Sequence, residues 1–414
     1  MNVAIISPEF PPETNWGGVA TFNYNLAQII KRMGHQVYVL TAGPHWLQGT
    51  TQIIDGIHVN YIEYKFFNKL INQLYYRFPF NFVRLLGKKW LPLTAFSLKW
   101  NLYVWYAFRQ LNKKHAIDLI HTPDYHFPAF FLSFFYPKIS LVVNVQGSQR
   151  LLNQFEKRSI DRLLKGYFET FYVKKQAKTI LACSQFIKKE TLTYLPELKN
   201  KIISIPNFLN NKLYINNNKC NVENIVFWGR LEYRKGVDIL ISAFSNVAKN
   251  NKNLKLFLIG EPGEHFPYKS SSISFKEYFN NSKLSESIKK RIFIYSRIDN
   301  SKALIEFLKS LKGIAIFPSR YEPFGYVTIE AMALGYITIT GSNGGGQEII
   351  QDGYNGFLAL SNKTSLLKTL KRIYKMPNNH ITTISNNAVA TVATKFSLNK
   401  MTILYKKIYK TINT

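Results

Sequence analysis

The sequence predicts an α/β protein made of two doubly wound, Rossmann-like domains. Three observations support this prediction. Short apolar runs alternate with amphipathic stretches, a second series of the same kind follows, and a polar segment separates the two. A chain of 414 residues has the length of two or three domains. Because such sheets bind ligands at the carboxyl ends of their strands, we expect the two domains to face a central cleft.

The first series opens with a β-α-β unit. Val3–Ser7 is a short, β-branched apolar run, typical of a buried parallel strand. Gly17 and Gly18 close the loop after it, and apolar residues then recur at helical spacing up to Met33. Further strands are predicted at Gln36–Thr41, Ile117–His121, Ser140–Gln146, Lys178–Ser184 and Lys201–Ile205.

A polar stretch marks the boundary between the predicted domains. Residues 209–223 are almost wholly polar and form the best linker in the sequence. We therefore expect an N-terminal domain over residues 1–208 and a C-terminal domain over residues 224–390. The remaining residues, 391–414, carry apolar side chains at helical spacing and predict a terminal helix.

The second series repeats the alternation after the linker. Its predicted strands are Asn224–Trp228, Leu254–Ile259, Arg291–Tyr295, Gly313–Phe317 and Ile337–Thr340. Its predicted helices are Val237–Ala248, Ser285–Lys290, Asn300–Lys309 and Thr328–Leu334. This order favours a second parallel sheet that is covered by helices.

The charge balance favours an anionic partner. Lys and Arg number 54 against 24 Asp and Glu, which gives a formal charge of +30, and the excess is spread over both halves of the chain. No nucleic-acid motif accompanies it, so we expect no nucleic-acid partner. Tyr75–Trp90 mixes aromatic rings with cations, as helices on anionic membrane surfaces do. A buried helix pair with solvated lysines explains that segment equally well.

The sequence offers no sign of export or of a membrane span. Two cysteines are too few for a disulfide framework or a cysteine-based zinc site. The first residues lack the basic region of a signal peptide, and the longest charge-free apolar run, Tyr125–Pro137, is shorter than the roughly 20 residues of a spanning helix. We expect a cytoplasmic protein, with attachment to the inner face of a membrane left open.

One glycine-flanked loop combines two cations. Gly229 follows a predicted strand, and Arg230 and Lys235 come next, ahead of the helix that starts near Val237. A guanidinium, an ammonium and backbone N–H groups in one loop suit a phosphate group. Two solvated surface cations are the competing interpretation.

Two carboxylates frame the most specific motif. Glu322 lies in the loop before the predicted helix Thr328–Leu334, and Glu330 lies within that helix, among apolar residues. A buried, unpaired carboxylate would be costly, so a hydroxyl-rich ligand such as a nucleotide sugar would explain both residues. The alternative is a helix cap at Glu322 and a solvent-facing Glu330.

At these residues the sequence resembles a glycosyltransferase of the GT-B fold, and it is most similar to the retaining glycosyltransferase family 4, also described as glycosyl transferases group 1. The family's elements appear in the expected order over nearly the whole chain. They are an early Gly-Gly loop, Pro206-Asn207 at the domain junction, Gly-Arg-Leu with Lys-Gly, the two glutamates, and the glycine-rich loop Gly344–Gly346 before Glu348. Several matches in one order are more specific than any single one.

The resemblance assigns roles to individual residues. It implies that Arg230 and Lys235 bind the donor diphosphate, that Glu330 holds the ribose, and that Glu322 contacts the transferred sugar. It also implies that the donor is contacted by Gly229, Arg320, and the backbone of Phe324 and Gly325. Gly17 and Gly18 would line the cleft from the N-terminal, acceptor-binding domain, and the last helix would pack back on that domain.

One position departs from the family pattern. Many members carry a His-Gly pair after an N-terminal-domain strand, where this chain has Gln146-Gly147. Glutamine can hydrogen-bond a sugar hydroxyl but takes no proton near neutral pH. His121, after the preceding strand, is a candidate for a polar group on the acceptor side, although a structural role suits it as well.

The resemblance, taken with these residues, implies a retaining hexosyltransferase that uses a UDP- or GDP-sugar and a glycan or lipid-linked acceptor in cell-surface polysaccharide synthesis. No aspartates are spaced as Asp-x-Asp, so we expect no metal and no cofactor, and the leaving charge would fall to Arg230, Lys235 and helix amides. Two alternatives remain. One is an epimerase or hydrolase of nucleotide sugars on the same fold, and the other is a donor-binding protein with impaired catalysis.

Overall fold

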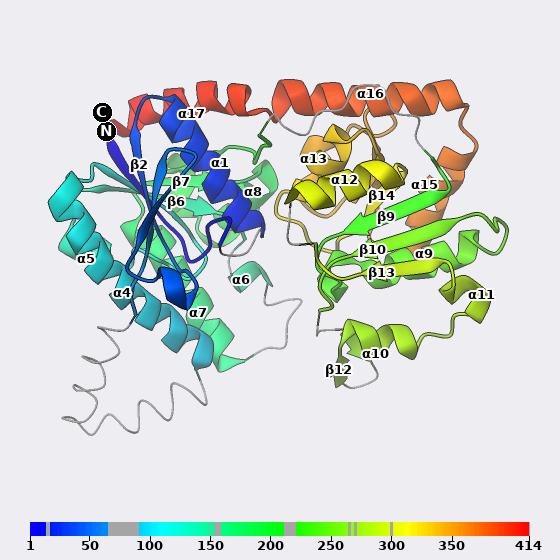
Figure 1. Ribbon diagram of the computed structural model, residues 1–414, viewed down its shortest axis with the longest axis horizontal. Coiled ribbons are helices and arrows are strands. Elements are labelled where there is room, and N and C mark those ends of the chain that lie inside the picture. Colours follow the sequence, from blue (N-terminus) through cyan, green and yellow to red (C-terminus); the bar gives the residue numbers. More distant parts are fainter. Residues whose placement is uncertain are drawn as a thin grey trace. The chain divides into compact units, whose positions relative to one another are not determined.

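The computed structural model describes residues 1–13, 17–64, 91–147, 149–152, 159–210, 221–263, 266–268, 271–298 and 301–413. The chain divides into two compact units. Unit 1 comprises Met1–Pro206 with Met401–Thr414, and unit 2 comprises Asn207–Lys400 (Figure 1). The centre of the predicted linker, residues 211–220, and the segment Tyr75–Trp90 lie outside the described residues.

Unit 1 is built on a sheet of eight described strands in the order β3-β4-β2-β1-β5-β6-β7-β8. Its neighbours pair in parallel except β3 and β4, which are antiparallel. The strands are β1 (Asn2–Ile6), β2 (Gln36–Thr41), β3 (Thr51–Ile54), β4 (Ile57–Tyr61), β5 (Leu119–Pro123), β6 (Ser140–Val145), β7 (Thr179–Ala182) and β8 (Ile202–Ser204). The strand order reverses between β1 and β5.

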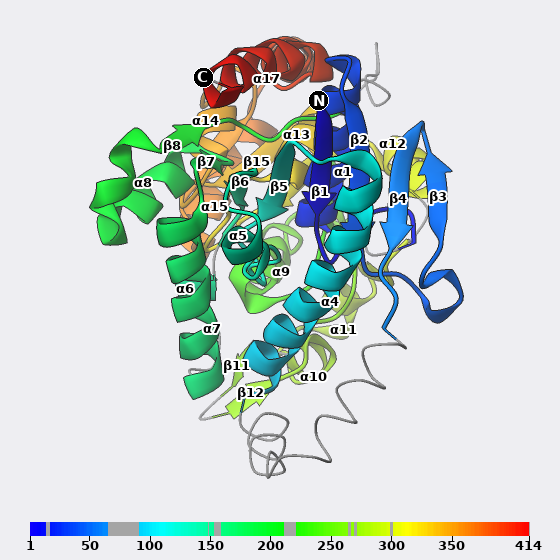
Figure 2. The same ribbon diagram turned by 90° about the vertical axis from the view of Figure 1, so that its left-hand side faces the viewer.

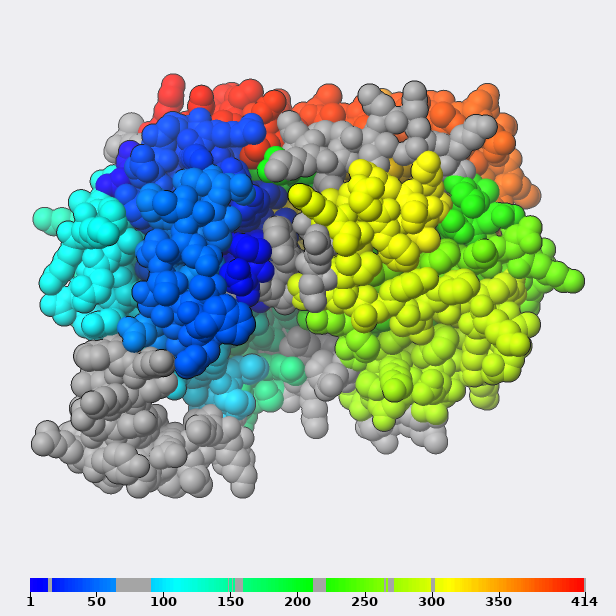
Figure 3. All heavy atoms as spheres, in the orientation of Figure 1, coloured from blue at the N-terminus to red at the C-terminus, as the bar shows by residue number. Residues whose placement is uncertain are grey.

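Helices cover both faces of this sheet, which is why the central strands are apolar on both sides. The helices are α1 (Gly18–Arg32), α4 (Pro92–His115), α5 (Leu132–Phe135), α6 (Gln149–Leu152), α7 (Ile160–Phe171) and α8 (Gln185–Tyr194), and Figure 2 shows α4 and α7 side by side. The antiparallel pair β3–β4 lies at the sheet edge, on the blue surface of unit 1 in Figure 3.

The last helix, α17 (Leu398–Asn413), packs on unit 1, which confirms the prediction that the terminal helix returns to the N-terminal domain. Its Tyr409 hydroxyl lies 2.8 Å from Nε2 of His121, and the Tyr409 ring stacks on His35. The structure divides the predicted segment 391–414 between two helices, because α16 (Asn378–Lys395) continues to Lys395 within unit 2.

Unit 2 is built on a sheet of six described strands that all pair in parallel, in the order β13-β10-β9-β14-β15-β16. The strands are β9 (Asn224–Trp228), β10 (Lys255–Ile259), β13 (Ile292–Tyr295), β14 (Ile314–Phe317), β15 (Ile337–Gly341) and β16 (Phe357–Ala359). The strand order reverses between β9 and β14, which marks the carboxyl ends of these two strands as the expected ligand site.

The helices of unit 2 follow its strands in the predicted alternation. They are α9 (Val237–Val247), α10 (Phe275–Asn280), α11 (Glu286–Lys289), α12 (Ser301–Leu311), α13 (Tyr326–Ala333), α14 (Gly346–Ile349), α15 (Lys363–Tyr374) and α16. A small antiparallel pair, β11 (Phe266–Tyr268) and β12 (Ser271–Ile273), lies apart from the main sheet. In the described part of the chain, no helix has the length and apolarity needed to cross a bilayer.

Candidate active site

Two loops of unit 2 meet at the switch in strand order. One loop follows β9 and runs from Gly229 to Gly236, and the other follows β14 and runs from Pro318 to Gly325. They are joined through their backbones, because the N–H of Arg320 donates to the Arg234 carbonyl oxygen at 2.8 Å. The guanidinium of Arg234 in turn donates to the Tyr321 carbonyl oxygen at 3.0 Å. The two predicted donor motifs therefore form one site.

Glycine is required where these loops approach each other. Gly236 has a φ of +73°, and a Cβ added there would lie 2.1 Å from the Pro318 carbonyl oxygen. Gly344, in the glycine-rich loop after β15, has a φ of +147°, and its Cβ would lie 2.1 Å from the Glu322 carbonyl oxygen. Any side chain at either position would push the loops apart.

An ion pair lies at the centre of the site. Nζ of Lys235 is 2.5 Å from Oε2 of Glu322, and both side chains are largely buried. Burial alone would raise the pKa of Glu322, but the charges of Lys235, Arg234 and Arg230 outweigh it and lower that pKa. Burial lowers the pKa of Lys235, and Glu322 opposes this shift. Glu322 is therefore a carboxylate that can accept hydrogen bonds from hydroxyl groups.

Glu330 faces the same region from α13. Its Oε2 accepts a hydrogen bond from the indole N–H of Trp228, the last residue of β9, at 2.9 Å. Burial raises the pKa of Glu330, while the Trp228 hydrogen bond and the charge of Lys235 oppose the shift. The sequence predicted that Glu330 lies on an apolar helix, and the structure shows how its carboxylate is held there.

The structure places the other predicted donor-side residues in different settings. Arg230 is 65% exposed and pairs with Glu232 at 3.4 Å, so its guanidinium group can reach a ligand. Phe324 is buried, with its ring against Phe396, and Gly325 takes a φ of +107° at the start of α13. Among the described residues, no side chain caps that helix start. An uncapped helix start leaves backbone N–H groups that can bind an anion.

Arg320 requires a correction. Its guanidinium binds both oxygens of Asp238, at 2.7 and 2.6 Å, and stacks on the ring of Tyr233. The pair with Asp238 uses the N–H edge of the guanidinium, which would otherwise bind a phosphate. The Tyr233 ring covers the planar face of the same group. Arg320 thus braces the β9 loop against the β14 loop, and these contacts use the groups that a donor phosphate would need.

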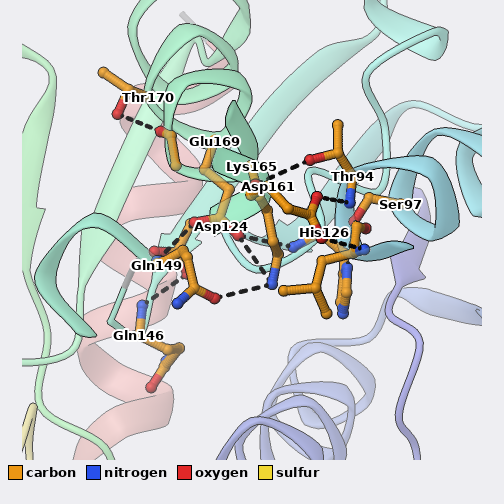
Figure 4. A network of polar contacts seen from close by, with 12 residues as sticks. Thr94, Ser97, Asp124, His126, Gln146, Gln149, Asp161, Lys165, Glu169 and Thr170 are labelled. Atoms are coloured by element: carbon orange, nitrogen blue, oxygen red, sulfur yellow. Dashed lines mark hydrogen bonds and ion pairs between the residues drawn. The ribbon is translucent and has the colours of Figure 1, made fainter. Parts of the chain in front are cut away.

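The predicted acceptor-side loop lies in unit 1, at the carboxyl end of β6. The backbone N–H of Gln146 donates to Oδ1 of Asp124, the residue that follows β5, at 3.1 Å. Oε2 of Glu169 accepts from the Gln149 N–H at 2.7 Å, and Lys165 lies 3.6 Å from Oε1 of Glu169 (Figure 4). Two buried carboxylates and one buried cation therefore fix the backbone of this loop.

Burial perturbs these carboxyl groups strongly. It raises the pKa of Asp124 to about 6, against backbone hydrogen bonds and the charge of Lys165. It raises the pKa of Glu169 to about 7, against the charge of Lys165. Asp124, Lys165 and Glu169 were not predicted as site residues from the sequence. The only available signal was a polar residue every fourth position in α7.

His121 also requires a correction. It is fully buried within β5, its Nε2 lies beside the Tyr409 hydroxyl, and burial lowers its pKa to about 3. It joins α17 to the sheet and does not reach the acceptor side. Gly17 and Gly18 lie as predicted at the start of α1, where no side chain of the described residues caps the helix. Their contact with a ligand stays a prediction, as do the roles of Arg230, Lys235, Glu322 and Glu330.

Two parallel-sheet units, the second with a charged site where its strand order reverses, define the class of GT-B glycosyltransferases. The family model described as Glycosyltransferase Family 4 matches residues 16–212, and the model described as Glycosyl transferases group 1 matches residues 214–390. Together the two models cover nearly the whole chain. The chain belongs to this glycosyltransferase family and is an enzyme of that class.

Individual proteins agree with this assignment. An uncharacterized glycosyltransferase of Methanocaldococcus jannaschii is 28% identical over 74% of this chain and 78% of its own. A capsular polysaccharide biosynthesis glycosyltransferase of Staphylococcus aureus, CapM, is 26% identical over 67% of this chain and 75% of its own. The crystal structure of Anabaena HepE in complex with UDP and glucose matches with a TM-score of 0.64 and 18% identity, over 99% of this chain and 100% of that one.

Proposed function

We propose that the protein transfers a hexose from a nucleoside diphosphate sugar, with retention, to a glycan or lipid-linked glycan acceptor in cell-surface polysaccharide synthesis. The observation that carries the proposal is the cluster of Lys235, Glu322 and Glu330 at the strand switch of unit 2. Two similar proteins support its finer parts. HepE was crystallised with UDP and glucose, and CapM is named for capsular polysaccharide biosynthesis.

The chemistry of each group suits one part of such a donor. Lys235 and Arg230 would neutralise the diphosphate, and uncapped amides at the start of α13 would donate to its oxygens. Glu330, whose Oε2 is occupied by Trp228, would accept from the ribose hydroxyls through Oε1. Glu322 would accept from the hydroxyls of the transferred sugar.

The central ion pair would position an ammonium group for the donor. Lys235 lies against Glu322 in the structure, and an ammonium group has three N–H donors, so it can also contact an incoming diphosphate. The pair therefore holds the cation in place before the donor arrives, and this avoids the reorganisation that a free lysine would need. The diphosphate that leaves would find its counter-charge already positioned, which lowers the barrier to departure.

The proposal is tested first by donor binding and then by transfer. A panel of UDP-, GDP- and ADP-sugars is screened by thermal shift, because a ligand that binds the folded state raises its melting temperature. The stabilising donor is then incubated with lipid-extract acceptors, and release of the nucleoside diphosphate is followed. Glu322→Gln should lower turnover at least about 100-fold. Glu306→Gln, an exposed glutamate on α12 of the same unit, is the matched control.

Three outcomes would contradict this assignment. Turnover of the donor without any acceptor would favour an epimerase or hydrolase. Donor binding without transfer over a broad acceptor panel would favour a binding protein, as the glutamine at position 146 suggests. Full activity of Glu322→Gln would show that the site lies elsewhere.

A further inference from the structure

Helix α7 turns its charged side toward the interior of unit 1. Asp161, Lys165 and Glu169 recur every four residues and are 4%, 1% and 0% exposed. The Asp161 carboxylate accepts from the backbone N–H groups of Leu93 at 2.7 Å and Thr94 at 2.9 Å, at the start of α4. Lys165 and Glu169 hold the loops after β5 and β6, as Figure 4 shows. These contacts fix the rotation of α7 about its axis.

The opposite side of α7 is apolar and faces solvent. Ile160, Leu163 and Tyr167 are 68%, 59% and 66% exposed. At about 100° per residue, they form one stripe that lies roughly half a turn from the buried charged stripe. Phe96 of α4, two residues beyond the amide that Asp161 binds, is also more than half exposed. An amphipathic helix ordinarily buries its apolar side, so a reversed helix indicates a surface that contacts something outside the chain.

The solvent-accessible charges of the described helices α4 and α7 are all positive. Helix α4 contains no acidic residue, and both acidic residues of α7 are buried. Lys99 is exposed one turn after Phe96, and Arg162 lies within the apolar stretch of α7. In the sequence, Glu156, Lys157 and Arg158 come shortly before α7 with a net charge of +1, and the whole chain carries +30. The partner that complements such a surface is apolar inside and anionic at its boundary.

We propose that the outer face of α7, together with Phe96 of α4, docks on an anionic lipid bilayer. The apolar and aromatic side chains enter the boundary between headgroups and acyl chains, while the neighbouring cations contact lipid phosphates. A second copy of this strongly cationic chain is a poor partner because of charge repulsion. The inference is independent of the transfer reaction, since it rests on α4 and α7 of unit 1 alone.

Co-sedimentation with vesicles tests this directly, in the absence of donor or acceptor. The full chain should bind vesicles of phosphatidylcholine with phosphatidylglycerol and should not bind pure phosphatidylcholine, and added salt should weaken the binding. The double substitution Leu163→Ser with Tyr167→Ser should weaken binding to the anionic vesicles at least about tenfold. Because both side chains are exposed, the double variant should keep the wild-type melting temperature.

A matched pair of variants identifies the face. Ile160→Ser lies on the proposed surface, and Ile403→Ser makes the same change at an exposed isoleucine of α17 in the same unit. Only Ile160→Ser should reduce vesicle binding. The proposal is overturned if the wild-type chain does not bind anionic vesicles, or if Ile160→Ser and Ile403→Ser bind them equally well. It is also overturned if the double variant has a much lower melting temperature, because the chain itself would then cover this face. A change only in self-association, or only in binding to an acidic protein, would overturn it as well.

Discussion

Replacing Lys165 by methionine probes the buried charges that fix the Gln146 loop. Lys165 Nζ and Glu169 Oε1 are 3.6 Å apart, and at an effective dielectric constant near 20 two unit charges at that distance attract by about 5 kcal/mol. Removing one partner of a buried pair costs about 3–5 kcal/mol, because the other charge is left without compensation. Methionine keeps most of the aliphatic stem, so loss of packing adds little.

The loss of stability in Lys165→Met should depend on pH in a defined direction. Burial raises the pKa of Asp124 to about 6 and that of Glu169 to about 7 in the folded chain. A carboxyl with a raised folded pKa stabilises the fold below its unfolded pKa, near 4, and this stability is lost as pH rises through the folded value. Without Lys165 both folded pKa values rise further. The variant should therefore be most impaired at pH 8 and nearly equal to wild type at pH 5.

Hydrogen exchange of the β6 peptides in a urea titration measures this effect in unit 1 alone. We expect Lys165→Met to lower the free energy of unfolding by about 3–5 kcal/mol at pH 8 and by less than about 1 kcal/mol at pH 5. Adding Glu169→Gln to Lys165→Met should recover part of the loss at pH 8. An equal loss at both pH values would refute the electrostatic reasoning and point to packing.

Three further substitutions test the framework of the fold. Gly236→Ala should lower the free energy of unfolding by at least about 2 kcal/mol, because the added Cβ would lie 2.1 Å from a carbonyl oxygen. An unchanged melting temperature would contradict the close approach of the loops. Arg320→Lys should lose the bidentate contact with Asp238 and lower the free energy of unfolding by about 1–2 kcal/mol, while the affinity for UDP stays unchanged. A large loss of UDP affinity would instead support a role of Arg320 in donor binding. Tyr409→Phe should cost about 1 kcal/mol and speed the hydrogen exchange of α17, and unchanged exchange would show that the hydroxyl contact does not hold this helix.

Most of the architecture could be predicted from the sequence because buried parallel strands are short, apolar and regularly followed by helices. Strands such as Gln36–Thr41 and Asn224–Trp228 have the bounds that the periodicity indicated. The edge pair Thr51–Ile54 and Ile57–Tyr61 was missed, since strands that are half exposed and carry polar residues resemble loops in a single sequence.

The candidate site could be predicted in part. Lys235 stood out as a cation in a glycine-flanked loop and Glu322 as a carboxylate in the most specific motif, and the structure brings them into contact. Arg320 was assigned to the donor from the family resemblance, and its partner, Asp238, is 82 residues away and cannot be recognised by spacing. His121 was misplaced for the same reason, since only the fold reveals that α17 covers it.

The charged residues of α7 were the hardest to interpret. A helix with alternating charged and apolar residues is expected to bury the apolar side, and α7 does the reverse. The amides that its carboxylates bind lie at the starts of α4 and α6, 68 and 20 residues away in the sequence, so local pattern alone could not reveal the reversal.

The most direct test of the central claim is the affinity of the chain for UDP or the nucleoside diphosphate of the donor found by screening, measured by calorimetry in wild type, Lys235→Met and Glu306→Gln. If the switch point of unit 2 holds the donor diphosphate, Lys235→Met should weaken binding about 10- to 100-fold, since a charge-assisted contact is worth about 1.5–3 kcal/mol. Glu306→Gln should match wild type. Unchanged affinity in Lys235→Met would contradict the proposed location of the donor site.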